Sequence, residues 1–354
     1  MPRFFTMGGG GVEEGAVLPS SHEGGRRKMS SDRESSNTTT PSDRVSLETV
    51  NILFTLSGND TEFLSEWAVA FKSVLMNAPV DHDMTIHILC DQAGYGRVKY
   101  ILIKDIKLSD WKSRNQITVD LHNVQNRIQG WEHFMNVTSN STKLSYKHSI
   151  GTYFRLFAHE VILDDSARHV IYLDTDVAIF VNLEEIWTHC DDSVMFQWGT
   201  TKTAGFMIFN LPLYRAHFWK YVKELSIKYG LRKAMHGKPI NDQRLLQAVE
   251  ENYSNTTALL PDAWDTHVAA GAWGWKTIRK VLKMRPEMGF LHINGGAWSK
   301  SSAFDSPFLT TDARFNTTYL AARYYATFPW LWAKFFLASQ IGAREGYPVK
   351  INYS

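Results

Sequence analysis

The sequence predicts an α/β fold in which a mostly parallel sheet is covered by helices on both faces. Short apolar runs rich in β-branched residues alternate along the chain with segments whose apolar residues recur at helical spacing. Apolar residues make up 44% of the 354 residues, which is enough for a large core. Several apolar runs lead directly into Asp, Asn or Gly, the residue types found where open α/β sheets bind ligands.

The first half of the folded region alternates strand and helix. Residues 50–56 are apolar and are followed by a polar turn, so they indicate a buried strand. Apolar residues then recur at helical spacing over 63–75, until Asn77-Ala-Pro79 stops the helix. Residues 85–90 and 117–121 indicate two further strands.

The second half resumes the pattern after an exposed polar loop over 122–142. His169–Leu173 is a buried strand that runs directly into Asp174-Thr175-Asp176. The remaining predicted elements are a helix near 144–161, strands at 194–196, 206–210 and 289–292, a helix at 214–229 and another that begins at Asn241. This order of strands and helices is typical of a doubly wound α/β domain.

The two ends of the chain differ from the folded domain, which we place at 47–300. Residues 1–46 are mostly small and polar and cannot offset the entropy of ordering, so they predict a disordered tail or stem. Residues 301–354 predict an aromatic helical extension packed on the core. Its most apolar stretch contains Pro329 and Lys334, which argues against a membrane span.

Composition excludes several classes of protein. The 38 basic and 36 acidic residues leave a net charge of +2, so we expect no nucleic-acid partner. Two cysteines, Cys90 and Cys190, rule out a disulfide scaffold and a four-cysteine zinc module. Their pairing stays open, although the position of Cys90 within a predicted strand favours a reduced core thiol.

Asparagines followed by the glycosylation pattern N-x-Ser/Thr are over-represented. Chance would produce roughly two such sites. The chain has eight, at Asn37, Asn59, Asn136, Asn140, Asn252, Asn255, Asn316 and Asn352. This excess predicts residence in the Golgi or ER lumen, with the cytoplasm as the alternative because residues 1–11 show no complete signal peptide. If the N-terminus is incomplete, the excess of glycosylation sites and the missing signal peptide agree, and the missing segment could carry a membrane tether.

The strongest local signal for chemistry is Asp174-Thr175-Asp176 at the end of a predicted strand. Carboxylates at positions i and i+2 can bind one hard divalent cation through oxygen. Such a metal can bridge the phosphates of a nucleotide and stabilise a departing diphosphate. The alternative is a strand-end turn in which both aspartates bond their own backbone.

Three further positions each allow a functional and a structural interpretation. His292 ends a predicted strand and precedes two glycines, so it is either a metal ligand or a buried core histidine. Asp242 and Gln243 begin a predicted helix, where an aspartate commonly serves as a cap. Arg155 lies on a small, polar helix face and is otherwise a solvated arginine.

Together these residues resemble family 8 glycosyltransferases, retaining enzymes of the GT-A fold that use nucleotide sugars, usually UDP-sugars, with Mn²⁺. The resemblance covers residues 50–300 and rests on five motifs in order. They are Tyr153-Phe-Arg-Leu156, Val170–Asp176, Ala204–Asn210, Asn241-Asp-Gln243 and His292-Ile-Asn-Gly295. The segment 291–298 is more similar to the eukaryotic glucoside xylosyltransferase branch than to the bacterial galactosyltransferases.

The resemblance implies a metal centre for Mn²⁺. Asp174 would contact the nucleotide ribose and the metal, with Thr175 beside it in the donor site. Asp176 would be the main metal ligand, and His292 would complete the protein's share of the coordination sphere.

The resemblance also implies the remaining contacts to a UDP-sugar. Arg155 would reach toward the donor, and Asp242 and Gln243 would lie beside the sugar, with the glutamine near the anomeric carbon. Gly295 would let the backbone approach the diphosphate. Asn59, at the end of the first strand, is the expected contact of the uracil, a role that conflicts with its glycosylation.

Two positions depart from the family pattern. The lysine that touches the diphosphate is replaced by Trp298, with Lys300 two residues further on as the substitute. The asparagine before Ala-Gly is replaced by Thr203. Both departures leave open which sugar is used, among xylose, glucose and galactose.

The predicted activity is therefore transfer of a sugar from a UDP-sugar to a glycan, glycoprotein or polysaccharide acceptor. Because Gln243 is a poor nucleophile, we expect front-face attack by the acceptor, with Asp242 as the alternative nucleophile. Two other functions remain open at this point. One is a phosphatase or phosphotransferase of the haloacid-dehalogenase type, although Ala178 departs from its motif, and the other is a pseudoenzyme that binds nucleotide sugars.

Overall fold

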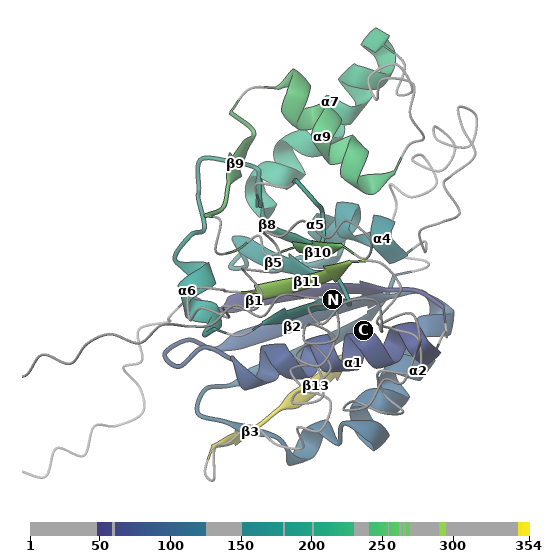
Figure 1. Cartoon of the computed structure of the whole chain (residues 1–354), viewed down its shortest axis with the longest axis vertical. Coiled ribbons are helices and arrows are strands. Elements are labelled where there is room, and N and C mark those ends of the chain that lie inside the picture. Colours follow the sequence, from purple (N-terminus) through teal and green to yellow (C-terminus); the bar gives the residue numbers. More distant parts are fainter. Residues whose placement is uncertain are drawn as a thin grey trace, which may run out of the picture. The chain divides into compact units, whose positions relative to one another are not determined.

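The computed structural model describes residues 48–58, 61–124, 151–179, 181–199, 202–229, 241–253, 255–261, 264, 267–269, 290–294 and 346–354. The predicted tail over 1–46 lies outside these residues, as does the predicted helical extension up to residue 345. The described part is a mixed α/β structure around one large sheet (Figure 1).

The large sheet has eight strands in the order β13-β4-β2-β1-β5-β8-β7-β9. Neighbouring strands from β13 to β5 are parallel, whereas β8 runs antiparallel to both β5 and β7. Its strands are β1 (Val50–Leu56), β2 (Met84–Cys90), β4 (Ile117–Asn123), β5 (His169–Leu173), β7 (Phe196–Trp198), β8 (Phe206–Asn210), β9 (Thr257–Leu259) and β13 (Lys350–Tyr353). The predicted mostly parallel α/β sheet is therefore confirmed.

Two small sheets accompany the large one. The first joins β10 (His267–Ala269), β11 (Phe290–Asn294) and β6 (Val177–Ile179), and the second joins β12 (Tyr347–Pro348) to β3 (Lys112–Ser113). The chain's last residues thus form strands, where the sequence predicted a helical extension over 301–354. Their short, exposed segments carry little apolar pattern, and they become strands by pairing with β3 and β4.

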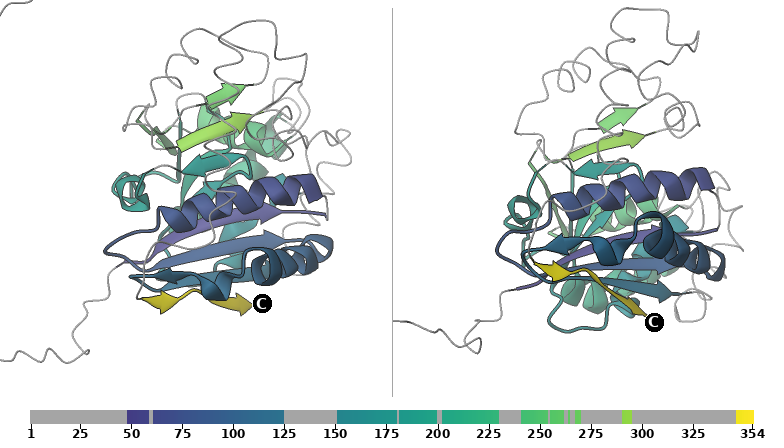
Figure 2. Two further views of the ribbon diagram at one scale, coloured as in Figure 1. Left: turned by 60° about the horizontal axis from the view of Figure 1, so that its bottom comes forward. Right: turned by 90° about the horizontal axis from the view of Figure 1, so that it is seen from below.

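Helices cover both faces of the large sheet (Figure 2). They are α1 (Thr61–Met76), α2 (Gln92–Tyr100), α4 (Gly151–Phe154), α5 (Ala158–Val161), α6 (Leu183–Trp187), α7 (Leu211–Tyr229) and α9 (Asp242–Asn252), together with a π-helical turn (Ile101–Asp105) and 3₁₀ turns at Leu108–Asp110 and Arg155–Phe157. Of the helices that the structure describes, none is long and apolar enough to cross a membrane.

Alternation along β1 divides the interior into two cores. Ile52 and Phe54 face one side, where they pack with α1, α2 and α6. Leu53 faces the other, where it packs with the segment 151–162 and with α7 and α9. Each side chain in these cores that loses contact with water stabilises the fold by about 1.5–3 kcal/mol. The strand is thereby clamped from both sides, which fixes where its carboxyl end lies.

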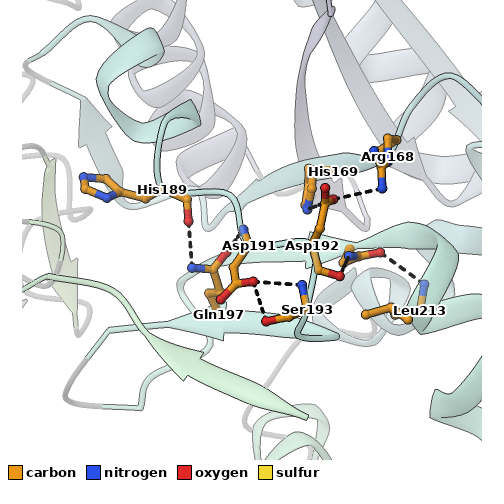
Figure 3. Close-up of polar contacts among 9 residues, drawn as sticks. Arg168, His169, His189, Asp191, Asp192, Ser193, Gln197 and Leu213 are labelled. Atoms are coloured by element: carbon orange, nitrogen blue, oxygen red, sulfur yellow. Dashed lines mark hydrogen bonds and ion pairs between the residues drawn. The ribbon is translucent and has the colours of Figure 1, made fainter. Parts of the chain in front are cut away.

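The amino-terminal edge of β5 is closed by a polar network (Figure 3). Buried Gln197 donates from Nε2 to the carbonyl of His189 over 2.8 Å and accepts the Asp191 amide over 3.0 Å. Asp192 lies 3.1 Å from Arg168 and 3.6 Å from His169. These contacts provide partners for the polar groups of the loop between α6 and β7, so we assign them a structural role.

The two cysteines are not paired with each other. Cys90 is buried within β2, and burial with the nearby Asp91 raises the pKa of its thiol well above the usual value. This confirms the expected reduced core thiol.

Candidate active site

The carboxyl ends of β1, β2 and β5 lie at one edge of the sheet, as parallel strands require. Asp91, which follows β2, caps α2 by accepting the Gly94 amide over 2.6 Å. The same carboxylate accepts the Gly58 amide at 2.9 and 3.1 Å, which holds the turn after β1. Gly58 has φ +73°, a conformation that favours glycine. The end of β1 and the start of α2 are therefore fixed relative to each other.

The Asp174-Thr175-Asp176 turn follows β5 at this edge. The Asp174 amide donates to the Gly205 carbonyl over 2.8 Å, and Val177 donates back to the Asp174 carbonyl over 3.3 Å. Thr175 is buried, whereas both aspartates are partly exposed. The turn thus holds two partly exposed carboxylates on a backbone fixed by two hydrogen bonds.

Arg155 is the centre of the site. Its side chain is only 3% exposed, and its Nη2 lies 3.2 Å from Asp174 Oδ1 while its Nε lies 3.0 Å from Asp242 Oδ2. Nε also donates to the Thr152 carbonyl over 2.8 Å, and Nη1 donates to the Ala204 carbonyl. One buried guanidinium therefore joins the turn after β5 to the start of α9, which excludes the solvated arginine that the sequence left open.

Electrostatics around Arg155 keep it charged. Burial alone would lower its pKa, but Asp174, Tyr172 and Asp242 raise it above its ordinary value, with a further contribution from Asp176. The guanidinium lies over the Tyr172 ring at 4.2 Å from the centroid. Burial raises the pKa of Tyr172 well above its usual value, so its neutral hydroxyl donates to Asp174 Oδ1.

The start of α9 contributes Asp242 and Gln243. Asn241 caps the helix by accepting the Arg244 amide over 2.8 Å, so Asp242 is not the N-cap that its position allowed. Asp242 is instead buried against Arg155. Gln243 donates from Nε2 to the Lys202 carbonyl over 3.1 Å.

Lys202 lies in the turn before the Ala204-Gly205 segment. It has φ +52°, and its carbonyl also accepts from Gln247 over 3.3 Å. Its ammonium lies 3.1 Å from Glu250 Oε1, so both ends of the residue are tied to α9. Thr203 follows it and is partly buried. The structure thus brings Thr203 and Gln243 near the ion-paired group of Arg155, Asp174 and Asp242.

The backbone of β11 places His292 beside the aspartate turn. In the antiparallel pairing of β11 with β6, His292 lies opposite Val177, the residue after Asp176. His267 on β10 pairs with His292 in the parallel direction. The predicted site residues Asn59, Gly295 and Lys300 lie outside the described residues.

Sequence reasoning missed two side chains of this site. Tyr172 lies two residues before Asp174, so strand alternation places both on one face, a signal that could have been read. Asp91 follows β2 as Asp174 follows β5. Its carboxylate accepts the backbone amides of Gly58 and Gly94, and no local sequence motif predicts these contacts.

Comparisons with known proteins report on the family and the fold of this chain. Residues 54–196 match the model of glycosyl transferase family 8. The structure is similar to that of mouse xyloside xylosyltransferase 1 in its apo form, with 14% identity over 70% of this chain and 98% of that one and a TM-score of 0.52. The galactosyltransferase LgtC in complex with donor and acceptor sugar analogues shows 18% identity over 78% and 95% of the two chains, with a TM-score of 0.48. No curated protein sequence matched. The family match confirms the predicted resemblance over residues 54–196, and the similarity to the xylosyltransferase structure confirms the predicted fold.

Proposed function

Because residues 54–196 carry a family 8 glycosyltransferase domain, we propose that this protein transfers a sugar from a UDP-sugar to a hydroxyl acceptor with retention of configuration. The family match supports a glycosyltransferase over the phosphatase that the aspartate motif alone left open. The donor sugar, which we place among xylose, glucose and galactose, and a glycan, glycoprotein or polysaccharide acceptor belong to the proposal.

One observation carries the proposal: the buried guanidinium of Arg155 joins Asp174 to Asp242 at the carboxyl edge of the sheet. That edge is where open α/β sheets bind nucleotides. The arrangement holds a proposed metal-binding carboxylate and a proposed sugar-binding carboxylate at fixed positions before any substrate arrives. Preorganisation of this kind lowers the cost of binding and of reaching the transition state.

The donor set at the aspartate turn fits a divalent cation such as Mn²⁺. Asp174 Oδ1 contacts Arg155 and Tyr172, and the side chain is 27% exposed, so the carboxylate borders solvent at the turn. Asp176 is partly exposed beside it, and the backbone of His292 lies opposite the next residue, Val177. Two carboxylates suit manganese, and the family resemblance adds the His292 imidazole as the third proposed ligand. When bound, the metal would neutralise charge on the diphosphate of the donor.

The chain's own residues would then act as follows. Arg155 stays protonated and orients both Asp174 and Asp242. The Asp242 carboxylate would accept hydrogen bonds from sugar hydroxyls. Gln243 is held by the Lys202 carbonyl through its amide nitrogen, so its oxygen remains the acceptor toward the sugar. Among the described residues that we place beside the sugar, Asp242 is the one candidate nucleophile. Its carboxylate is paired with Arg155, so we favour front-face attack by the acceptor hydroxyl over attack by Asp242.

A thermal-stability measurement with UDP-sugars tests the proposal. We expect one UDP-sugar to raise the melting temperature in the presence of Mn²⁺, because a ligand that binds only the folded state stabilises it. EDTA or the substitution Asp176→Ala should abolish the shift. Asp105→Ala, which removes an exposed carboxylate far along the chain from the site, is the matched control and should keep it.

Transfer is then measured with the donor so identified. Donor binding without hydrolysis or transfer to any acceptor would favour the pseudoenzyme. Full transfer activity of Asp176→Ala with Mn²⁺ present would refute the metal-assisted mechanism.

We also place the protein in the Golgi or ER lumen. Among the predicted glycosylation sites, Asn252 and Asn255 are exposed, which supports their modification there. Asn252 is the last residue of α9. A mass shift on glycosidase treatment that disappears in Asn252→Gln with Asn255→Gln would support this location, and unmodified protein from a secretory host would argue for the cytoplasm.

A further inference from the structure

The second face of the large sheet changes character from one side to the other. On β1, β5 and β8 it carries apolar residues of the core, such as Leu53 and Met207. On β2 and β4 it carries His87, Asp120 and His122, which we call the His-Asp-His cluster. Each offers a ligand atom, and these atoms lie within 4.8 Å of one another. The histidines are only 5% and 8% exposed.

Strand pairing holds the cluster together. In the parallel register of β2 and β4, His87 lies beside Asp120, and Leu89 lies beside His122. Asp120 and His122 are two residues apart on β4, so they point to the same face. The three ligand-bearing side chains are therefore brought together by backbone hydrogen bonds and not by a ligand.

Hydrogen bonds fix the tautomer of His87. Asn51 donates from Nδ2 to the Thr49 carbonyl over 3.0 Å, so its amide oxygen is the atom that faces His87. That oxygen lies 3.3 Å from His87 Nε2 and can only accept, so Nε2 carries the proton. In the neutral ring, Nδ1 then carries the lone pair.

The lone pair of His87 faces a carboxylate. Its Nδ1 is buried without a hydrogen-bond partner among the described residues, and it lies 3.6 Å from Asp120 Oδ2. Two acceptors face each other there, an unfavourable arrangement that a cation between them would relieve. Ligand atoms at about 2.0–2.2 Å from a tetrahedral metal lie about 3.4 Å apart, close to the observed separation.

Neighbouring groups orient the other two members in the manner of metal-site outer shells. Asp120 Oδ1 accepts from Asn352 Nδ2 over 2.8 Å, which directs Oδ2 toward His87. His122 Nδ1 lies 2.7 Å from the Ser354 hydroxyl. Both partners belong to β13 or follow it directly, so the cluster connects three adjacent strands, β13, β4 and β2.

We propose that His87, Asp120 and His122 bind a divalent transition-metal ion of the zinc type and thereby secure β13 to the sheet. Two imidazoles and one carboxylate favour zinc over magnesium or calcium. Asp120 is 23% exposed, which leaves an entry path and room for a water as fourth ligand. The site is separate from the Asp174 turn, because β1 lies between β2 and β5.

Zinc titration of the metal-stripped full chain tests this site, with affinity measured against a chelator competitor. We expect a zinc site whose affinity falls at least about 100-fold in Asp120→Asn, which keeps the side chain's size and its acceptor for Asn352, and which is distinct from any zinc bound at the Asp174 turn. His217→Gln, a partly exposed histidine on α7, and Asp176→Asn at the donor site should leave that affinity unchanged. Zinc should also raise the melting temperature of wild type but not of Asp120→Asn.

Substituting Co²⁺ gives an independent readout, because a four-coordinate site produces intense visible absorption that Asp120→Asn should lose. Equal zinc affinity of wild type and Asp120→Asn would overturn the proposal, as would a zinc site lost in Asp176→Asn instead. If Asp120→Asn does not fold, His122→Gln carries the same comparison. Manganese-dependent UDP-sugar binding is a separate measurement, so either proposal can fail without the other.

Discussion

Replacing Arg155 by methionine is expected to destabilise the protein strongly, although it removes only one polar side chain. The change keeps much of the buried volume but leaves the Asp242 carboxylate, 7% exposed and 3.0 Å from Arg155 Nε, without its cation. Breaking a buried ion pair from one side typically costs about 3–5 kcal/mol. Asp174 is 27% exposed and can be rehydrated, so we assign most of that cost to Asp242.

A double-mutant cycle separates the unpaired charge from lost packing. Adding Asp242→Asn to Arg155→Met removes the orphaned charge and should recover about 1–3 kcal/mol. Urea unfolding at pH 7, followed by circular dichroism, measures each variant. Arg168→Met is the matched control, since Arg168 and its partner Asp192 are 57% and 59% exposed, and such pairs contribute at most about 1 kcal/mol. A loss below about 1 kcal/mol in Arg155→Met, or strict additivity with Asp242→Asn, would refute this reasoning.

Three further predictions concern stability measured by urea unfolding. Burial with a nearby arginine lowers the pKa of His159 from 6.5 to about 4, so the unfolded chain takes up a proton first as pH falls. Stability should therefore decrease from pH 6.5 to 4 by up to about 3 kcal/mol, and His159→Gln should lose that part of the pH dependence. Gln197→Leu should lower the free energy of unfolding by about 1–3 kcal/mol, because the His189 carbonyl and the Asp191 amide lose their hydrogen-bond partner. An unchanged urea midpoint would contradict the structural role of the network in Figure 3. Gly151→Ala places a Cβ 3.0 Å from the backbone of Leu56 and should destabilise by about 1–3 kcal/mol, whereas Gly96→Ala in α2 meets nothing within 4 Å and should be neutral or stabilising.

The parts of the fold that the sequence predicted are those set by local pattern. β1 and β5 are apolar runs that end in polar turns, and their bounds agree with the structure at Val50–Leu56 and His169–Leu173. The helix predicted from Tyr214 begins earlier, at Leu211, because Pro212 is tolerated in a first helical turn. The strand expected at 194–196 is displaced to Phe196–Trp198, since pairing with β8 and β9 decides its bounds.

What the sequence could not provide is contact between distant segments. The sequence placed Arg155 and Asp242 in the donor site but not against each other, and only the packing of the 3₁₀ turn and α9 against one sheet edge makes them an ion pair. The same holds for β13, whose few residues form a strand by pairing with β4. The alternation that places Asp120 and His122 on one face was visible in the sequence, but the register that brings His87 beside them was not.

The charge of the candidate active site leads to a last prediction, that donor binding depends strictly on a metal. Among the described side chains of the site, Arg155 contributes +1, and Asp174, Asp176 and Asp242 contribute −3, a formal sum of −2 at the edge where we propose that the diphosphate lies. Arg155 is already shared between two carboxylates, so it has little attraction left for an added anion. UDP should therefore cause no thermal shift in EDTA and a clear shift with Mn²⁺. Asp176→Asn should weaken the manganese-dependent binding but make the metal-free site less repulsive. Equal UDP affinity with and without Mn²⁺ would show that other cationic groups bind the diphosphate and would remove the need for the metal in donor binding.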